Sequence, residues 1–185
     1  MPAGGKFPGM GTLRTQSDAS SPNGGPEAVA DGQPCWLTPD EQQAWRAHLA
    51  TSKLLSRQLD RDLNPFGLGI NDYEILVVLS ESPDQRLRMT DLADATAQSR
   101  SRLSHQITRM EASGLVRRDT CPGDKRGLYA VLTDEGMATI ERVAPHHVAS
   151  VRRHFINLLT DDQLSAIREG YTTVIDHLRE IRERD

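Results

Sequence analysis

The side chains best suited to chemistry are the basic ones gathered between residues 97 and 127. This segment carries seven arginine and lysine side chains against three acidic ones, a formal charge of +4, whereas the remainder of the chain carries −8. A short basic segment in an acidic chain is the electrostatic footprint of a surface that docks on phosphate. The alternative is a charged cluster that only faces solvent. The charge pattern favours nucleic-acid binding and leaves both interpretations open.

A helix predicted from Ser99 to Ser113 divides this segment into an apolar side and a basic side. Leu103, Ile107 and Met110 fall on one side, which we expect to pack inward. The opposite side carries small residues interleaved with basic ones: Ser101, Arg102, His105, Thr108, Arg109 and Ala112. Such a face can enter the major groove of DNA without bulk and still reach base edges.

Two kinds of DNA contact are expected along that helix. Arg102 and Arg109 are the candidates for reading bases, because a guanidinium can donate two hydrogen bonds to guanine. Ser99, Arg100 and Ser101 occupy the first turn, where unpaired N–H groups favour phosphate. A purely solvated basic face is the alternative.

Two predicted strands, at residues 115–120 and 128–132, enclose a turn rich in glycine and proline and form a hairpin with a basic tip. Asp124 and Arg126 can form an ion pair that holds the tip, while Lys125 or Arg126 enters a minor groove. An ion pair with no role in DNA binding is the alternative. Cys121 adjoins this tip, whose cations would favour a reactive thiolate. A passive small residue is the alternative role of Cys121.

Capping signals predict the elements that position these residues. We expect helices to begin at six capping residues: Thr38, Asn71, Thr90, Ser99, Thr133 and Thr160. The second helix should end before Pro83, and Gly114 should end the fourth. Pro145 should kink or break the helix that follows Thr133. The predicted fold is mainly α with a small β-hairpin wing (α+β), which is a winged helix-turn-helix with long helices at both ends.

Composition restricts the class of protein further. Residues 1–33 are rich in glycine, proline and serine, lack a periodic apolar pattern, and are expected to form a disordered tail. No stretch has the pattern of a signal peptide or the apolar length of a membrane span, so we expect a soluble, cytoplasmic protein. Cys35 and Cys121 are too few for a disulfide framework or a four-cysteine zinc site.

The sequence resembles the MarR family, the multiple-antibiotic-resistance type of winged helix-turn-helix transcription regulators. The resemblance covers about residues 36–184, and the order of the elements also matches. It is carried by residues 89–96, the helix at 99–110 with Glu111 and Gly114-Leu115-Val116-Arg117-Arg118 after it, the wing tip Asp124-Lys125-Arg126-Gly127, and Leu132-Thr133-Asp134-Glu135-Gly136.

The resemblance implies a repressor that binds a pseudo-palindromic operator in double-stranded DNA as an obligate homodimer. The helices at residues 36–66 and 134–185 would form the dimerisation region, and residues 70–133 the DNA-binding lobe. A small-molecule effector, phenolic or anionic, would release the DNA. The family's wing also implies a structural ion pair between Asp124 and Arg126, although Lys125 stands where the family often has glutamate.

Geometry independently favours a dimer. Two recognition helices must lie about 34 Å apart to enter successive major grooves on one face of the duplex. A monomer cannot set that distance, whereas long terminal helices packed between two chains can.

An effector pocket is expected near Trp45 and His48 on the first helix and Asp72 and Tyr73 on the second. Dimer packing is the alternative role of these four residues. Because no recognised metal-ligand pair and no catalytic motif is found, we predict no metal site, no cofactor and no enzymatic activity. Two alternative functions stay open: a winged-helix module that binds a protein partner, and a redox-responsive repressor that uses Cys121.

Overall fold

The computed structural model describes the backbone of residues 35–121 and 124–184. It describes the side chains of the same residues, except those of 121, 124–126 and 183–184. The predicted tail at residues 1–33 lies outside the described residues. Contacts divide the chain between Ala50 and Thr51 into two units, and each unit is described by itself. Within the described ranges, no helix combines the length and the apolar character needed to cross a membrane.

The first unit contains the beginning of α1 (Pro39–Leu63), which starts as predicted. The Thr38 N–H donates to the Glu41 carboxylate at 2.7 Å, and the Glu41 N–H donates to the Thr38 hydroxyl at 3.3 Å. These reciprocal bonds satisfy two backbone donors near the helix start. The rings of Trp45 and His48 stack farther along the helix, with centroids 5.6 Å apart.

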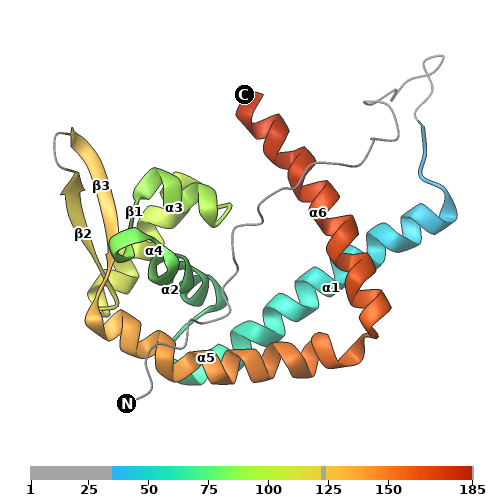
Figure 1. Ribbon diagram of the computed structural model, residues 1–185, viewed down its shortest axis with the longest axis horizontal. Helices are drawn as coiled ribbons and strands as arrows, with labels where there is room; N and C mark the ends of the chain where they lie inside the picture. The colour runs from blue at the N-terminus through green and yellow to red at the C-terminus, as the bar shows by residue number, and fades with distance from the viewer. Residues whose placement is uncertain (1–34, 122–123, 185) are drawn as a thin grey trace. The chain divides into compact units, whose positions relative to one another are not determined.

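The second unit holds the rest of α1 and all later elements, and it confirms a mainly helical fold with a wing. In chain order the elements are η1 (Asn64–Phe66), α2 (Ile70–Glu81), η2 (Pro83–Gln85), β1 (Arg86–Arg88), α3 (Met89–Ala95), α4 (Arg100–Ala112), β2 (Val116–Cys121), β3 (Asp124–Leu132), α5 (Asp134–His154), η3 (Ile156–Leu158) and α6 (Asp161–Arg184) (Figure 1).

The wing is a three-stranded antiparallel sheet in the order β1-β3-β2, where the sequence predicted only two strands. In the additional strand, Arg86 lies opposite Val131 and Arg88 lies opposite Tyr129. A segment of three residues with two arginines has no strand signal of its own. Its extended form depends on hydrogen bonding to β3, which is more than forty positions away in the chain.

Capping on both sides of the wing follows the prediction. The Ser99 hydroxyl accepts from the Arg102 N–H at 3.3 Å, at the start of α4. Gly114 ends this helix with φ +73°, a left-handed conformation that glycine adopts without strain. The Thr133 hydroxyl accepts from the Gly136 N–H at 3.0 Å and begins α5.

Two predicted helix starts were wrong. Helix α2 begins at Ile70 rather than after Asn71, because the Asp72 carboxylate accepts from the Gly69 N–H at 2.9 Å. Helix α3 begins at Met89 directly after β1, and the Thr90 hydroxyl donates to Asp91 instead of capping the helix. Helix α2 thus begins through a different local capping bond, earlier in the chain than predicted, whereas α3 begins where β1 ends.

The two C-terminal helices differ in their agreement with the sequence. Of the kink or break predicted at Pro145, the break is absent, because helix α5 runs continuously through this residue. Helix α6 begins at the predicted capping box: the Thr160 N–H donates to Gln163 at 2.9 Å, and the Gln163 N–H donates to Thr160 at 3.3 Å.

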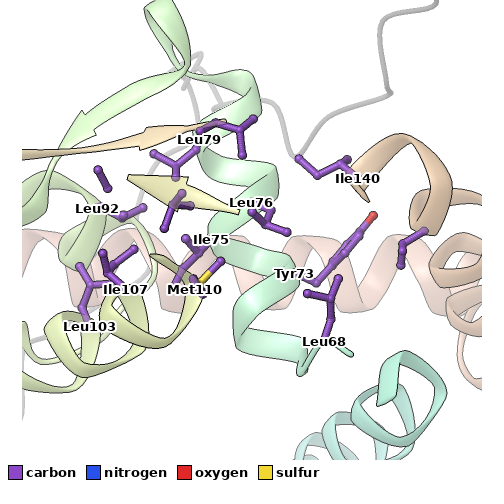
Figure 2. Packing of buried hydrophobic residues seen from close by; sticks show 14 of the residues in the cluster. Leu68, Tyr73, Ile75, Leu76, Leu79, Leu92, Leu103, Ile107, Met110 and Ile140 are labelled. Carbon is purple, nitrogen blue, oxygen red and sulfur yellow. The ribbon is translucent and has the colours of Figure 1, made fainter. Parts of the chain in front are cut away.

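A single apolar core holds α2, α3, α4, the sheet and the beginning of α5 together (Figure 2). Its members include Leu76 and Leu79 of α2, Leu92 of α3, and Leu103 and Ile107 of α4, all fully buried. Burying each such side chain stabilises the fold by roughly 1.5 to 3 kcal/mol. The core therefore fixes which face of α4 is turned outward.

Candidate nucleic-acid interface

Helix α4 carries most of the predicted DNA contacts, and its inner face is held by packing. Leu103 and Ile107 are completely buried and Met110 is 2% exposed, as predicted from their spacing. The expected contact residues of α4 and its cap are all exposed: Ser99, Arg100, Ser101, Arg102, His105, Thr108 and Arg109. The fold therefore leaves this face of the helix open to a large partner.

The cations of this face differ in how they are held. In the described part of the chain, the side chains of Arg100, Arg102 and His105 have no hydrogen-bonded or ion-paired partner. The Arg100 side chain also belongs to the first turn of α4, where the helix dipole adds positive potential. Two long cationic side chains and an imidazole are thus available to acceptors outside the chain.

Arg109 is held differently, because it faces an acidic residue of α2. Its guanidinium lies 3.7 Å from Asp72, and the arginine side chain is 72% exposed while that of Asp72 is 16% exposed. Asp72 also accepts from the Gln106 amide at 3.0 Å and from the Gly69 N–H at 2.9 Å. Asp72 therefore links the start of α2 to α4.

Tyr73, another predicted pocket residue, is 8% exposed and packs against the His147 ring, with centroids 4.3 Å apart. Burial raises the pKa of the Tyr73 hydroxyl and lowers the pKa of His147. Trp45 and His48 belong to the first unit and contact each other. The grouping of all four residues in one effector pocket stays a prediction.

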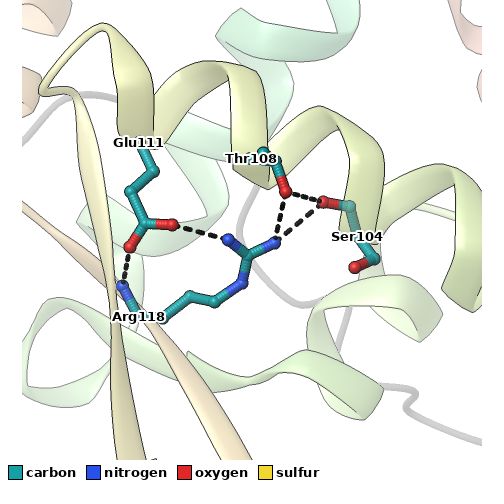
Figure 3. Close-up of polar contacts among 4 residues, drawn as sticks. All are labelled: Ser104, Thr108, Glu111 and Arg118. Atoms are coloured by element: carbon teal, nitrogen blue, oxygen red, sulfur yellow. Dashed lines mark hydrogen bonds and ion pairs between the residues drawn. The ribbon is translucent and has the colours of Figure 1, made fainter.

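Arg118 of β2 reaches across to α4 and contacts it at three levels (Figure 3). Its guanidinium donates to the Glu111 carboxylate at 2.5 Å, to the Ser104 carbonyl at 2.9 Å and to the Thr108 hydroxyl at 2.9 Å. The Thr108 hydroxyl itself donates to Ser104 at 3.0 Å. Thr108, predicted as a DNA contact, is thus already engaged on both its donor and acceptor sides.

A cleft of about 340 Å³ lies between the first turn of α4, the start of α3 and the wing. Its lining residues are Arg88, Met89, Thr90, Arg100, Ser104, Arg118, Gly127 and Leu128. Arg88 and Thr90 were not among the predicted contacts, because the sequence did not reveal the strand that brings them beside α4. Arg88 and Arg100 make this cleft electrostatically suited to a phosphate group, whereas the Arg118 guanidinium is bonded to Glu111.

The wing sheet carries further basic side chains around Tyr129. The guanidinium carbons of Arg86 and Arg88 lie 5.2 and 5.9 Å from the centre of the Tyr129 ring. Arg117 of β2 pairs with Asp119 at 3.0 Å, and its hydrogen bond lowers the pKa of that carboxyl. Sequence analysis had counted Arg117 by its charge only, and it had given Arg86 and Arg88 no role.

The predicted tip contacts cannot be located in the same way. The side chains of Cys121, Asp124, Lys125 and Arg126 lie outside the described residues, so the predicted ion pair, minor-groove contact and redox role stay predictions. The backbone places Cys121 opposite Asp124, at an irregularity of the β2–β3 register.

A polar cluster joins the end of α1 to α5 within the second unit. Asp62 accepts hydrogen bonds from the Ser150 hydroxyl and from Gln58, the latter at 2.8 Å, and lies 3.2 Å from the His154 imidazole. The bond from Ser150 is the main reason that the pKa of Asp62 lies below its ordinary value. In the described part of the chain, no group of three or more metal-binding side chains is present.

Comparison with known proteins identifies the fold. A family model described as "MarR family" matches residues 66–127. The crystal structure of AbsC, a MarR family transcriptional regulator from Streptomyces coelicolor, is 60% identical, with a TM-score of 0.74 over 78% of this chain and 98% of that chain. The chain belongs to the MarR family. It is accordingly a DNA-binding transcriptional regulator and not an enzyme.

Two further similar proteins are also transcriptional regulators. The structure of Sco3205 from Streptomyces coelicolor, determined in complex with DNA, is 45% identical, with a TM-score of 0.75 over 78% of this chain and 92% of that one. The regulator PecS of Dickeya dadantii (strain 3937) is 28% identical over 128 residues, which span 69% of this chain and 76% of PecS. The resemblance inferred from the sequence is confirmed at the level of family and fold.

Proposed function

We propose that this MarR-family chain is a repressor that binds a pseudo-palindromic operator as a homodimer and is released by a small-molecule effector. The observation that carries the proposal is the open basic face of α4, where Arg100 and Arg102 have no partner among the described residues. Such a face beside a wing matches the geometry of major-groove recognition. A regulator of this kind acts in the cytoplasm, where its operator is.

Homodimer formation is supported by an exposed apolar stripe on α6. The exposed residues of this stripe are Tyr171, Val174, Ile175, Leu178 and Ile181, with exposed fractions between 40% and 58%. They recur every three or four positions, which is the spacing with which one helix packs against another. We assign residues 36–66 and 134–185 to dimerisation and residues 70–133 to a DNA-binding lobe.

Release by an effector is supported by the position of Asp72. This residue belongs to the predicted pocket, yet it also hydrogen-bonds Gln106 on the recognition helix. A phenolic or anionic ligand that displaced Asp72 would therefore disturb α4 directly. Arg109 would be affected as well, because its guanidinium lies 3.7 Å from the same carboxylate.

A titration on the DNA upstream of the protein's own gene tests the central part of the proposal. We expect a shifted complex whose affinity falls steeply between about 50 and 200 mM salt, because bound phosphates release counterions. The double substitution Arg100→Ala/Arg102→Ala should abolish the shift. Arg168→Ala on α6 is the matched control, since its side chain is 71% exposed and lies outside the DNA-binding lobe. Absence of a complex at low salt would contradict the proposal.

Expression measurements separate repression from activation. Deleting the gene should raise transcription from the bound promoter, and a fall would contradict the repressor assignment. Phenolic acids added to the preformed complex should release the DNA from the wild-type protein. If no compound of this class changes the affinity, the effector part of the proposal fails while operator binding stands.

A further inference from the structure

Arg118 is a basic residue of the DNA-binding lobe whose charge is used inside the protein. Its backbone N–H donates to Glu111 at 2.9 Å, in addition to the three side-chain contacts with Glu111, Ser104 and Thr108. These acceptors lie at successive turns of one face of α4. The side chain is only 22% exposed, although it borders the cleft between α4 and the wing.

We propose that Arg118 is a positioning residue for operator recognition: with Glu111 it holds the recognition helix at a set rotation and distance from the wing, and it does not bind phosphate. The inference rests on the proposed binding of an operator by α4. It goes beyond that proposal by removing one of the seven cations of the basic segment from the DNA contacts and giving it another role.

The physical reason is that apolar packing leaves one motion of α4 weakly restrained. Leu103 and Ile107 bury their side chains in the core, but apolar contacts are not directional and permit small rotations about the helix axis. Hydrogen bonds are directional, and a planar guanidinium that donates at three heights along a helix opposes such a rotation. Because base readout requires side chains to be placed within a fraction of an ångström, a small rotation of α4 would cost sequence specificity.

The neighbouring arginine provides the contrast. Arg117 precedes Arg118 in β2 and therefore points to the opposite face of the sheet, where it pairs with Asp119 and is 55% exposed. Among the described residues, Arg117 forms no hydrogen bond or ion pair with α4, and it has the same charge as Arg118. A comparison of variants at these two adjacent arginines thus separates two effects on DNA binding: the loss of a charge and the loss of a connection to α4.

The test compares variants on two duplexes of equal length, the operator fragment and a random sequence, at several salt concentrations. Glu111→Gln is the most informative variant, because it removes a negative charge from the DNA-binding lobe. Simple electrostatics predicts tighter DNA binding for Glu111→Gln. The positioning role predicts the reverse: operator affinity falls by roughly tenfold, as expected for losing one charge-assisted hydrogen-bonded pair, and affinity for random DNA stays within about twofold.

Arg118→Lys keeps the charge but cannot span the three acceptors, so we expect it to lose operator affinity as Arg118→Ala does. The salt dependence of Arg118→Ala should equal that of the wild type, whereas Arg100→Ala should lower the logarithmic slope by about 0.9 for each lost phosphate contact. Arg117→Ala serves as the control for loss of charge on the same strand and should leave the ratio of operator to random affinity unchanged.

Three results would overturn the inference: tighter operator binding by Glu111→Gln, normal operator binding by Arg118→Lys, or a reduced salt slope with equal losses on both duplexes for Arg118→Ala. Circular dichroism and thermal unfolding verify that each variant is folded. If Arg118→Lys unfolds, the result for Glu111→Gln decides whether the inference holds. This variant leaves Arg118 and its two uncharged acceptors, the Ser104 carbonyl and the Thr108 hydroxyl, in place. A wild-type protein that binds neither duplex would instead refute the proposed function itself.

Discussion

Gly136 packs directly against the backbone of Leu115, so closely that a β-carbon at position 136 would lie 2.2 Å from the Leu115 carbonyl oxygen. The Thr133 hydroxyl donates to the Leu115 carbonyl at 2.9 Å and to the Gly114 carbonyl at 2.7 Å. These contacts connect the first turn of α5 to the end of α4, just before β2 begins. The Leu-Thr-x-x-Gly pattern of the sequence thus has a structural reason: it joins the recognition helix to a helix of the proposed dimerisation region.

Replacing Gly136 with alanine should therefore destabilise the protein. The added methyl group would meet a backbone oxygen and a Leu132 methyl carbon at 2.7 Å, and a backbone oxygen cannot move aside as a flexible side chain can. We expect a loss of about 3 kcal/mol in the free energy of unfolding, the upper end of the range for overpacking. Urea denaturation followed by circular dichroism measures this loss.

Gly170→Ala on α6 is the matched control, because nothing lies within 4 Å of a β-carbon at that position. In a helix interior, alanine is favoured over glycine, so this variant should be neutral or more stable by up to about 1 kcal/mol. Equal stabilities for the two variants would show that the contact with Leu115 relaxes without cost.

Arg102→Ala should relax sequence preference more than it weakens binding overall. Arg102 is exposed on the outer face of α4 and has no side-chain partner among the described residues, so it is available to a guanine edge. Loss of a two-bond contact of this kind costs roughly 1 to 3 kcal/mol of discrimination. Competition between the operator and single-base variants of it measures the change. Equal losses on operator and random DNA would contradict the role of Arg102 as a base reader.

Ile175→Glu should convert the protein from dimer to monomer and weaken operator binding by at least about tenfold. A charge placed in an apolar seam between helices is left without a partner and without water. Analytical ultracentrifugation gives the oligomeric state. Leu128→Glu is the control, since Leu128 on the wing has the same exposed fraction of 40%. It should reduce DNA binding and leave the oligomeric state unchanged, and a dimeric Ile175→Glu variant would refute the assignment of the α6 stripe.

His147 should make stability depend on pH in the weakly acidic range. Burial lowers its pKa in the folded protein, so the unfolded chain takes up a proton more readily. The stability that the neutral ring contributes is complete above its unfolded pKa of about 6.5 and is lost as pH falls toward the folded pKa. The free energy of unfolding at pH 7.5 and 5.5 should thus differ less in His147→Phe than in the wild type.

The exposed His177 on α6 provides the comparison for that experiment. His177→Phe, measured in parallel, shows the effect of replacing a histidine with phenylalanine at an exposed position. Both variants keep all the carboxylates of the protein. The contribution of the carboxylates to the pH dependence of stability therefore cancels when each variant is compared with the wild type. An unchanged pH dependence in His147→Phe would show that the His147 ring is protonated equally in both states.

Several features followed from the sequence because they depend on neighbours within one helical turn. The capping residues Thr38, Ser99, Thr133 and Thr160 form the predicted bonds to N–H groups three positions farther on. The inward side of α4 was also predictable, since the 3.6-residue period alone places Leu103 and Ile107 together. With the Gly114 turn, these local signals were sufficient for the helix-turn-helix and for the exposed face of α4.

Other features were decided only by the tertiary structure, because their partners are distant in the chain. Strand β1 exists through its pairing with β3, and Asp72 meets Gln106 across 34 positions. Arg118 had contributed to the basic charge that first indicated DNA binding, yet packing of β2 on α4 turns its guanidinium toward Glu111. Residue types and spacing determine which helix can read DNA. Which cations remain free to do so depends on side-chain contacts between elements, and these form only when the chain is folded.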